Sequence, residues 1–139
     1  MNADENKALI QQIYAALEKA DSSLFRNHLH PDIRMIVTGQ NSWSRTLHGV
    51  DSLQQYYRYV YSRLRGPGRL IAERFIADAD LVVVEARGDR ISIDGERYDN
   101  QYCLVYQLAD GRIVEMREYM DSSLCERVLG RYPDGSSGS

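Results

Sequence analysis

Glu118 is the residue whose type and setting best suit proton-transfer chemistry. It lies in residues 112–121, RIVEMREYMD, which we predict to form a β-strand. Because side chains alternate sides along a strand, Glu118 shares a face with Val114, Met116 and Met120. A carboxylate packed against apolar side chains loses hydration, which raises its pKa and favours proton transfer near neutral pH. We therefore predict that Glu118 is a general acid or base. The alternative is a carboxyl at a frayed strand end, or one paired with a buried Arg or Tyr for structural reasons.

Two tyrosines could assist such an acid. Tyr56 and Tyr57 fall on the apolar stripe of a helix predicted over residues 50–64. Tyrosines in such a stripe more often serve the core or an interface than catalysis. A phenol aimed into the same cavity as Glu118 would, however, polarise a ligand carbonyl or hydroxyl while the carboxylate handles its proton. Tyr56 and Tyr57 are the catalytic candidates beside Glu118.

Other catalytic signatures are missing from the sequence. His28 and His30 precede Pro31 at a predicted helix end, where a capping or surface role suits a histidine without a positioned partner. No cluster of His, Asp and Glu has metal-ligand spacing, so we expect no metal. Cys103 has no neighbouring cation to activate its thiol. Serine nucleophile elbows, Walker loops and dinucleotide-binding glycine patterns are absent, and no organic cofactor is implied.

Composition restricts the class of protein. With 139 residues, 43% of them apolar, the chain suits one domain over residues 1–133. Residues 134–139, DGSSGS, are predicted to be a flexible tail, in part added for expression. A net charge of −3 without a basic stripe predicts no nucleic-acid partner, and the short apolar runs predict no membrane span. Two cysteines are too few for a disulfide framework, so we expect reduced thiols and a cytoplasmic location.

The apolar periodicity alternates between helix and strand. It predicts helices over 4–20, 21–30, 50–64 and 122–129. It predicts strands over 33–37, 42–47, 70–77, 81–88, 90–93, 98–108 and 112–121. Asp94-Gly95 and Asp110-Gly111 are hairpin signals between strands. This order predicts an α+β fold with helices packed on one face of a curved antiparallel sheet, and a cavity where the sheet curls around them.

The stretch 98–121, YDNQYCLVYQLADGRIVEMREYMD, is similar to the end of proteins in the nuclear-transport-factor-two-like superfamily, especially its SnoaL-like and ketosteroid-isomerase-like branches. Two further segments share the resemblance, IYAALEKAD at 13–21 and HGVDSLQQYY at 48–57. The resemblance implies a cystatin-like fold, in which a cone-shaped sheet is wrapped by about three helices around a deep hydrophobic pocket. It also implies a homodimer. One such scaffold hosts isomerases, cyclases, hydrolases and binding modules, so the activity has to come from the site.

The catalytic residues of ketosteroid isomerases do not carry over to this chain. Their base aspartate falls at or beside Val37, and their oxyanion-hole aspartate falls near Cys103. Their first-helix tyrosine matches Ile13, with Tyr14 one place away, whereas a supporting tyrosine of the third helix matches Tyr57. Steroid isomerisation is therefore not expected. The histidine or aspartate of SnoaL-type cyclases also lacks a counterpart.

Two further branches match in part. Epoxide-hydrolase-like proteins use an Arg-x-Asp pair, which Arg87-Gly88-Asp89 resembles. The apolar alternation of residues 82–88 places Arg87 and Asp89 outward, so that pair would be absent from a pocket. Phenazine-biosynthesis proteins share an acidic residue at Glu118, but their pocket histidine falls at Tyr56.

Together these observations predict a protein that binds a small apolar or cyclic metabolite. It would act as an isomerase, cyclase or hydrolase through Glu118, or else serve as a non-catalytic ligand-binding module or a dimeric scaffold of the same fold. We expect seven further residues to shape the ligand cavity: Tyr14, Met35, Val37, Trp43, Gln101, Cys103 and Met116. We expect self-association through an outer sheet face, with a docking surface for another protein as the alternative use of that face: Tyr102, Leu104, Tyr106, Ile113 and Tyr119.

Overall fold

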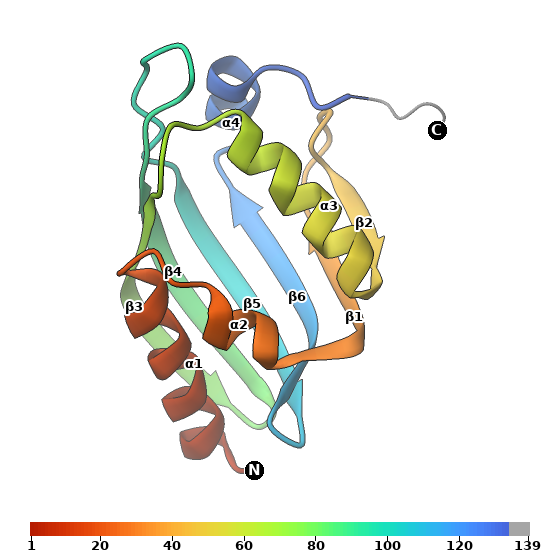
Figure 1. Cartoon of the computed structure of the whole chain (residues 1–139). Coiled ribbons are helices and arrows are strands. Elements are labelled where there is room, and N and C mark those ends of the chain that lie inside the picture. The colour runs from red at the N-terminus through yellow and green to blue at the C-terminus, as the bar shows by residue number, and fades with distance from the viewer. Residues whose placement is uncertain (134–139) are drawn as a thin grey trace.

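The computed structural model describes residues 1–133 (Figure 1). Over these residues four helices and six strands follow one another. In chain order they are α1 (Ala3–Leu17), α2 (Ser23–Asn27), β1 (Leu29–Val37), β2 (Arg45–His48), α3 (Gly49–Ser62), β3 (Arg69–Asp78), β4 (Leu81–Asp89), β5 (Gln101–Ala109), β6 (Arg112–Met120) and α4 (Ser122–Leu129). The predicted α+β class is confirmed. The tail predicted at 134–139 lies outside the described residues, and the single-domain boundary stays a prediction.

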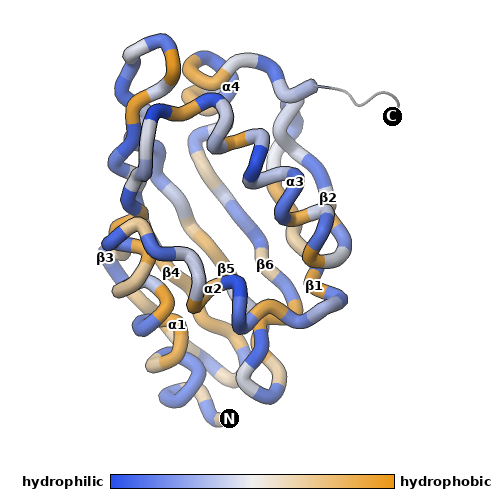
Figure 2. The backbone as a smooth tube through the Cα atoms, in the orientation of Figure 1, coloured by the Kyte–Doolittle hydropathy of each residue, from blue (hydrophilic) through white to orange (hydrophobic). Residues whose placement is uncertain are grey.

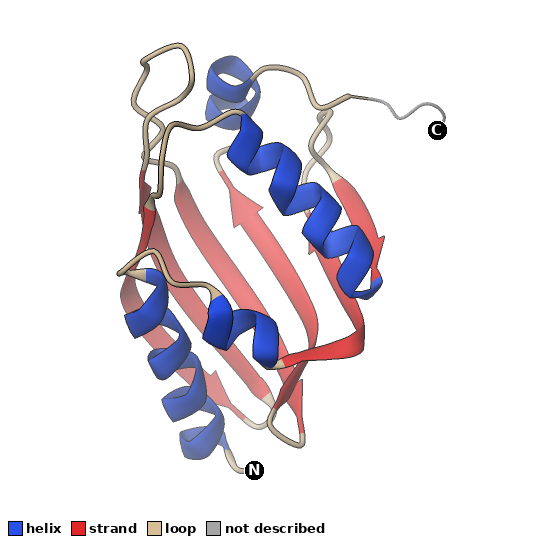
Figure 3. Ribbon diagram, viewed as in Figure 1, coloured by secondary structure: helices blue, strands red, loops and turns tan. Residues whose placement is uncertain are grey.

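The strands form one curved sheet in the order β2-β1-β6-β5-β4-β3. Only β1 and β6 pair in parallel among the described strands, and the other neighbours are antiparallel. Helices α1, α2 and α3 lie on the same side of the sheet, α1 over β3 and β4 and α3 over β1 and β2 (Figure 3). Strands β5 and β6 pass between these helices, and α4 closes one end of this arrangement. The middle of the concave face is therefore left for side chains and a ligand.

Local sequence explains the main elements. Helix α1 begins with a capping box, in which Asn2 Oδ1 accepts a hydrogen bond from Glu5 N (2.8 Å) and Glu5 Oε1 accepts one from Asn2 N (3.0 Å). Both hydrophobic and hydrophilic residues occur along α1 and α3, as expected for helices with one face against the sheet (Figure 2). Asp110 and Gly111 have φ angles of 52° and 74°, the left-handed backbone that a two-residue hairpin turn requires. The hairpin predicted between β5 and β6 is confirmed.

A register shift in this hairpin sets which side chains of β6 face inward. Gln107 pairs with Glu115, whereas Leu108 pairs with Ile113, so Val114 is an extra residue in β6. Ile113 is consequently buried in the core and was wrongly expected on the outer face. From Met116 onward the predicted alternation holds, and Glu118 points to the concave side.

Several predicted boundaries differ from the structure. Helix α2 ends at Asn27, and β1 begins at Leu29 and continues through Pro31. Pro31 is tolerated because β2 pairs only from Arg34 onward and the pairing with β6 shifts between Leu29 and Arg34, so no ladder hydrogen bond from residue 31 is needed. The strand predicted over 90–93 is reduced to two isolated bridges, at Ser92 and Ile91.

Candidate active site

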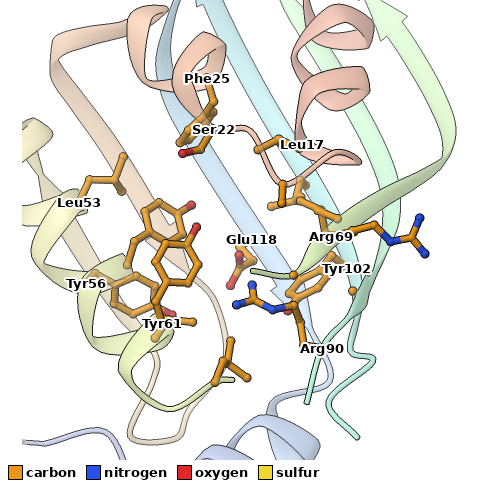
Figure 4. A pocket seen from close by; sticks show the side chains of 18 of the residues that line it. Leu17, Ser22, Phe25, Leu53, Tyr56, Tyr61, Arg69, Arg90, Tyr102 and Glu118 are labelled. Atoms are coloured by element: carbon orange, nitrogen blue, oxygen red, sulfur yellow. The ribbon is translucent and has the colours of Figure 1, made fainter. Parts of the chain in front are cut away.

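A cavity of about 640 Å³ lies between the concave face of the sheet and the helices (Figure 4). Volumes of this size accept compounds of several rings. Its wall is aromatic to an unusual degree and combines side chains from α2, the loop before β2, α3, the loop before β5, and β5. The aromatic lining consists of Phe25, Trp43, Tyr56, Tyr57, Tyr61, Tyr98, Tyr102 and Tyr106.

Glu118 is the acid that faces this cavity. It sits on β6 between Val37 of β1 and Leu104 of β5, and the residue is 9% exposed. Within residues 1–133 its carboxyl accepts no hydrogen bond and forms no ion pair. Burial raises its pKa to about 7, and no charged or hydrogen-bonding group contributes to that rise. The carboxyl is therefore able to accept and release a proton near neutral pH.

Tyr56 and Tyr57 approach Glu118 from α3. Their rings pack edge to face with centroids 5.7 Å apart. Burial, and secondarily the negative charge of Glu118, raises the pKa of both phenols, so both remain protonated donors. The Tyr57 hydroxyl donates to Met35 Sδ at 3.7 Å, a weak acceptor, and the Tyr56 hydroxyl has no hydrogen-bond partner among the described residues. The Tyr56 hydroxyl is therefore free to bind a ligand oxygen, and the Tyr57 hydroxyl can do so by giving up its weak bond to Met35 Sδ.

Strand β5 and the loop before it contribute a second group of phenols. Tyr106 shares a hydrogen bond of 2.6 Å with Tyr14, and Tyr98 accepts one of 2.9 Å from Asn100 Nδ2. Burial raises the pKa of Tyr102 and Tyr106, with Glu118 again among the causes. Glu118 thus faces phenols from both sides of the cavity.

The predicted cavity residues fall into three groups. Glu118, Tyr56, Tyr57, Trp43 and Met116 line the cavity. Their catalytic and binding roles stay predictions. Trp43 is fully buried in the turn before β2 rather than within a strand, and its Nε1 donates to Gly130 O at 2.8 Å.

The second group is buried beside the cavity without lining it. Met35 and Val37 are inward residues of β1, and Tyr14 is an inward residue of α1. They support the wall: Met35 accepts the Tyr57 hydroxyl and Tyr14 bonds the Tyr106 hydroxyl.

The third group lies on the outer face of the sheet, away from the cavity. Gln101 is exposed and Cys103 is half-buried, and neither lines the cavity. The inward residues of β5 are instead those of the opposite parity, Tyr102, Leu104 and Tyr106, which were predicted from the sequence to lie on an outer association face. That assignment was wrong because both faces of β5 carry apolar residues, so the alternation gives no contrast between them.

Strand β4 has the register that its sequence predicts. Gly88 lines the cavity, whereas Arg87 is exposed and Asp89, which bonds Arg69 (2.8 Å) and Arg97 (2.6 Å), does not line it. The Arg-x-Asp pair of epoxide-hydrolase-like proteins is therefore not present in this cavity.

Arginines near the cavity are the feature that sequence reasoning missed. The sequence around Gly66-Pro67-Gly68 has the glycine, proline and arginine content typical of a solvated loop, yet this loop lines the cavity. Across residues 1–133, the charged residues of the lining are one acid and four cations: Glu118, Arg26, Arg58, Arg69 and Arg90. The sequence signal for this role was the pair Gly66 and Gly68, because glycine lets the backbone of a loop come close to a ligand or to a neighbouring side chain.

The described part of the chain contains no group of three His, Cys, Asp or Glu side chains placed to hold a metal ion. Over the same residues, no helix is both long enough and apolar enough to span a bilayer.

Residues 10–116 match the family model of the SnoaL-like domain. The chain belongs to this family. No curated protein matches the chain significantly. The family assignment agrees with the order of elements and with the cavity described above.

Solved structures agree with the fold. A candidate SnoaL-like polyketide cyclase from Jannaschia sp. CCS1 is 18% identical with a TM-score of 0.75, over 94% of this chain and 95% of that one. An NTF2-like protein of unknown function from Burkholderia pseudomallei K96243 is 21% identical with a TM-score of 0.77, over 89% and 96%. TerC, co-crystallised with polyporic acid, is 22% identical with a TM-score of 0.76, over 89% and 97%. The protein therefore has the nuclear-transport-factor-two-like fold.

Proposed function

We propose that this protein binds a cyclic, largely apolar metabolite and moves a proton on it, with Glu118 as general acid or base. The observation that carries the proposal is the unpaired Glu118 carboxyl in a cavity of about 640 Å³, with a pKa raised to about 7 by burial. A base is most effective when its pKa lies near the working pH. Isomerisation, ring closure and hydrolysis all include such a step.

The geometry supports a simple proton transfer. The ionised Glu118 takes a proton from the carbon next to a ligand carbonyl, and the electron pair of that C–H bond moves into an enolate. The negative charge then rests on the former carbonyl oxygen, where the hydroxyls of Tyr56 or Tyr57 donate hydrogen bonds. Protonated Glu118 returns the proton to a carbon of the enolate, which completes the cycle without a cofactor.

Relatives support the ligand class. TerC was crystallised with polyporic acid, and the Jannaschia protein is described as a candidate polyketide cyclase. Both descriptions concern cyclic carbon skeletons. The aromatic lining of this cavity suits ligands of the same kind, because flat rings pack edge to face or offset against phenols.

Hydrogen exchange tests the proposal without knowledge of the natural substrate. Cyclic ketones of one to three rings, including 2-tetralone, are incubated with the protein in D2O, and deuterium entry next to the carbonyl is followed by NMR. We expect the wild-type protein to accelerate exchange and Glu118→Gln to lower the rate by about a hundredfold or more.

Glu115→Gln is the matched control, because Glu115 lies on the outer face of the same strand beside Arg34 and Arg117. It should retain the wild-type rate. Equal rates for wild type and Glu118→Gln would remove Glu118 from the chemistry.

The second candidate is a ligand-binding module without chemistry. It is favoured by one observation: no second acid or histidine accompanies Glu118 among the described lining residues. In that case every ketone that binds is recovered without added deuterium and chemically intact.

We further propose that the protein forms a homodimer through the outer face of the sheet. A row of apolar side chains crosses three strands there, because Ile76 pairs with Val83 and Val83 with Val105. Tyr119, 45% exposed, lies opposite Cys103 on the same face. Of the residues first assigned to association, only Tyr119 occupies this surface. Light scattering at micromolar concentration tests the proposal, and a persistent monomer would contradict it.

A further inference from the structure

Arg90 places a cation in the cavity, and no acid among residues 1–133 forms an ion pair with it. It follows β4, and its side chain lines the same cavity as Glu118 (Figure 4). Its Nε is buried and has no hydrogen-bond acceptor among residues 1–133. One terminal nitrogen reaches Gly66 O at 3.4 Å, and the guanidinium carbon lies 5.4 Å from the centre of the Tyr61 ring. A guanidinium has five N–H donors, so most of this group's bonding capacity is unused.

Neighbouring acids are bound elsewhere. Asp99 accepts the backbone N–H of Arg90 at 3.1 Å, but its carboxylate is bonded by Arg97 at 2.6 Å. Arg97 also bonds Asp89, which in turn bonds Arg69. This outer network neutralises the nearby carboxylates and leaves the Arg90 charge without an acidic partner in the described part of the chain.

The backbone is shaped to hold Arg90 in this position. Gly68 packs directly on its side chain: a Cβ at residue 68 would lie 1.7 Å from both Cδ and Nε of Arg90. Any other residue at this position would force the Arg90 side chain to move. The loop 66–68 therefore fixes the direction of the guanidinium on the cavity side.

The charge of the cavity is opposite to that of the protein. The chain carries a net charge of −3, whereas the described lining contains the single acid Glu118 and four arginines, of which Arg69 is paired with Asp89. Clefts lined by one sign of charge concentrate ligands of the opposite sign. The lining therefore favours anionic ligands over neutral ones of the same shape.

We propose that Arg90, flanked by Tyr61, is the subsite for an anionic oxygen substituent, such as a carboxylate, on a cyclic ligand. The planar guanidinium donates two parallel hydrogen bonds to the carboxylate oxygens. The ring system extends into the aromatic part of the cavity toward Glu118. The inference narrows the ligand class of the proposed function and requires the same cavity, but it concerns binding and not proton transfer.

The test compares two probes of almost equal shape, 2-naphthoate and its neutral amide 2-naphthamide. Binding is measured by NMR titration of the uniformly ¹⁵N-labelled protein, which also reports whether each variant is folded. We expect the wild-type protein to prefer the anion by about tenfold. Arg90→Gln should remove this preference and leave naphthamide binding unchanged, and Arg90→Lys should retain part of it.

Arg87→Gln is the matched control, since it removes the same charge from an exposed residue three positions earlier. It should keep the preference. Equal binding of the two probes to wild type, no binding of either at millimolar concentration, or an unchanged preference in Arg90→Gln would overturn the inference.

Glu118→Gln separates this inference from the proposed chemistry. This variant should keep the preference for naphthoate even though its proton-transfer activity is lost. A protein that prefers naphthoate but exchanges no ketone hydrogen would retain the Arg90 subsite and lose the catalytic proposal. The reverse result would retain the chemistry and exclude the subsite.

Discussion

Replacing Glu118 by glutamine should stabilise the protein at alkaline pH but not at acidic pH. Burial raises the Glu118 pKa from an ordinary value of 4.5 to about 7. A group that holds its proton more tightly in the folded state adds stability below its unfolded pKa and loses it as pH rises through its folded pKa. The wild-type protein therefore loses stability between pH 4.5 and about 7, whereas glutamine does not titrate.

The size of the effect follows from the two pKa values. Each pKa unit corresponds to about 1.4 kcal/mol, so moving from 4.5 to about 7 corresponds to about 3 kcal/mol. Glu118→Gln should therefore gain about 3 kcal/mol of unfolding free energy relative to wild type between pH 4.5 and pH 8. Comparing the two proteins at each pH removes the contribution of every other titrating group.

Urea unfolding at a series of pH values measures this difference. Trp43 is the only tryptophan in the sequence and is fully buried, so its fluorescence reports unfolding of the region beside the cavity. Glu115→Gln serves as the control. It removes a surface carboxylate near Arg34 and Arg117 and should cost at most about 1 kcal/mol.

Two results would refute the reasoning. A difference between wild type and Glu118→Gln that stays constant with pH would show that the carboxyl is not desolvated. A loss of stability in Glu118→Gln at every pH would show that the carboxyl holds a structural partner, as the scaffold interpretation requires.

Three further predictions concern the walls of the cavity and the outer face. Tyr14→Phe or Tyr106→Phe alone should lower the unfolding free energy by about 1 to 3 kcal/mol, because each leaves the other buried hydroxyl unpaired. The double variant should lower it by less than the sum of the two single variants. Additive losses of unfolding free energy in urea would contradict this. Gly68→Ala should abolish the preference for 2-naphthoate over 2-naphthamide, because its Cβ displaces the Arg90 side chain; an unchanged preference in the NMR titration would show that Arg90 acts from another position. Val83→Glu should convert the dimer into monomers in light scattering, since it places charge in the middle of the apolar row, and a dimer that survives this change would use a different face.

The sequence predicts the fold well because its strongest signals are local. The Asp110-Gly111 turn joins β5 to β6, and the apolar stripe of α3 directs Tyr56 to the sheet. The inward direction of Glu118 follows from Met116 two residues earlier, since the register shift ends before that point.

The rest of the site depends on information that local patterns do not hold. Strand β5 has apolar residues on both faces, so only its pairing with β4 and β6 decides that Tyr102 points inward and Cys103 outward. Arg90 enters the cavity from a connection outside the strands, held by a glycine 22 positions earlier in the chain. Neither position is defined by the periodicity of its own segment.

The parallel pairing of β1 with β6 has a consequence for how this protein is made. Val37 and Glu118 are neighbours across that pairing although they lie 81 positions apart in the chain. Contacts between such distant segments form late, because a long loop must close first. During translation the segment from α1 to α3 therefore leaves the ribosome before β6 is available to pair with β1, and the cavity takes shape only once β6 has emerged.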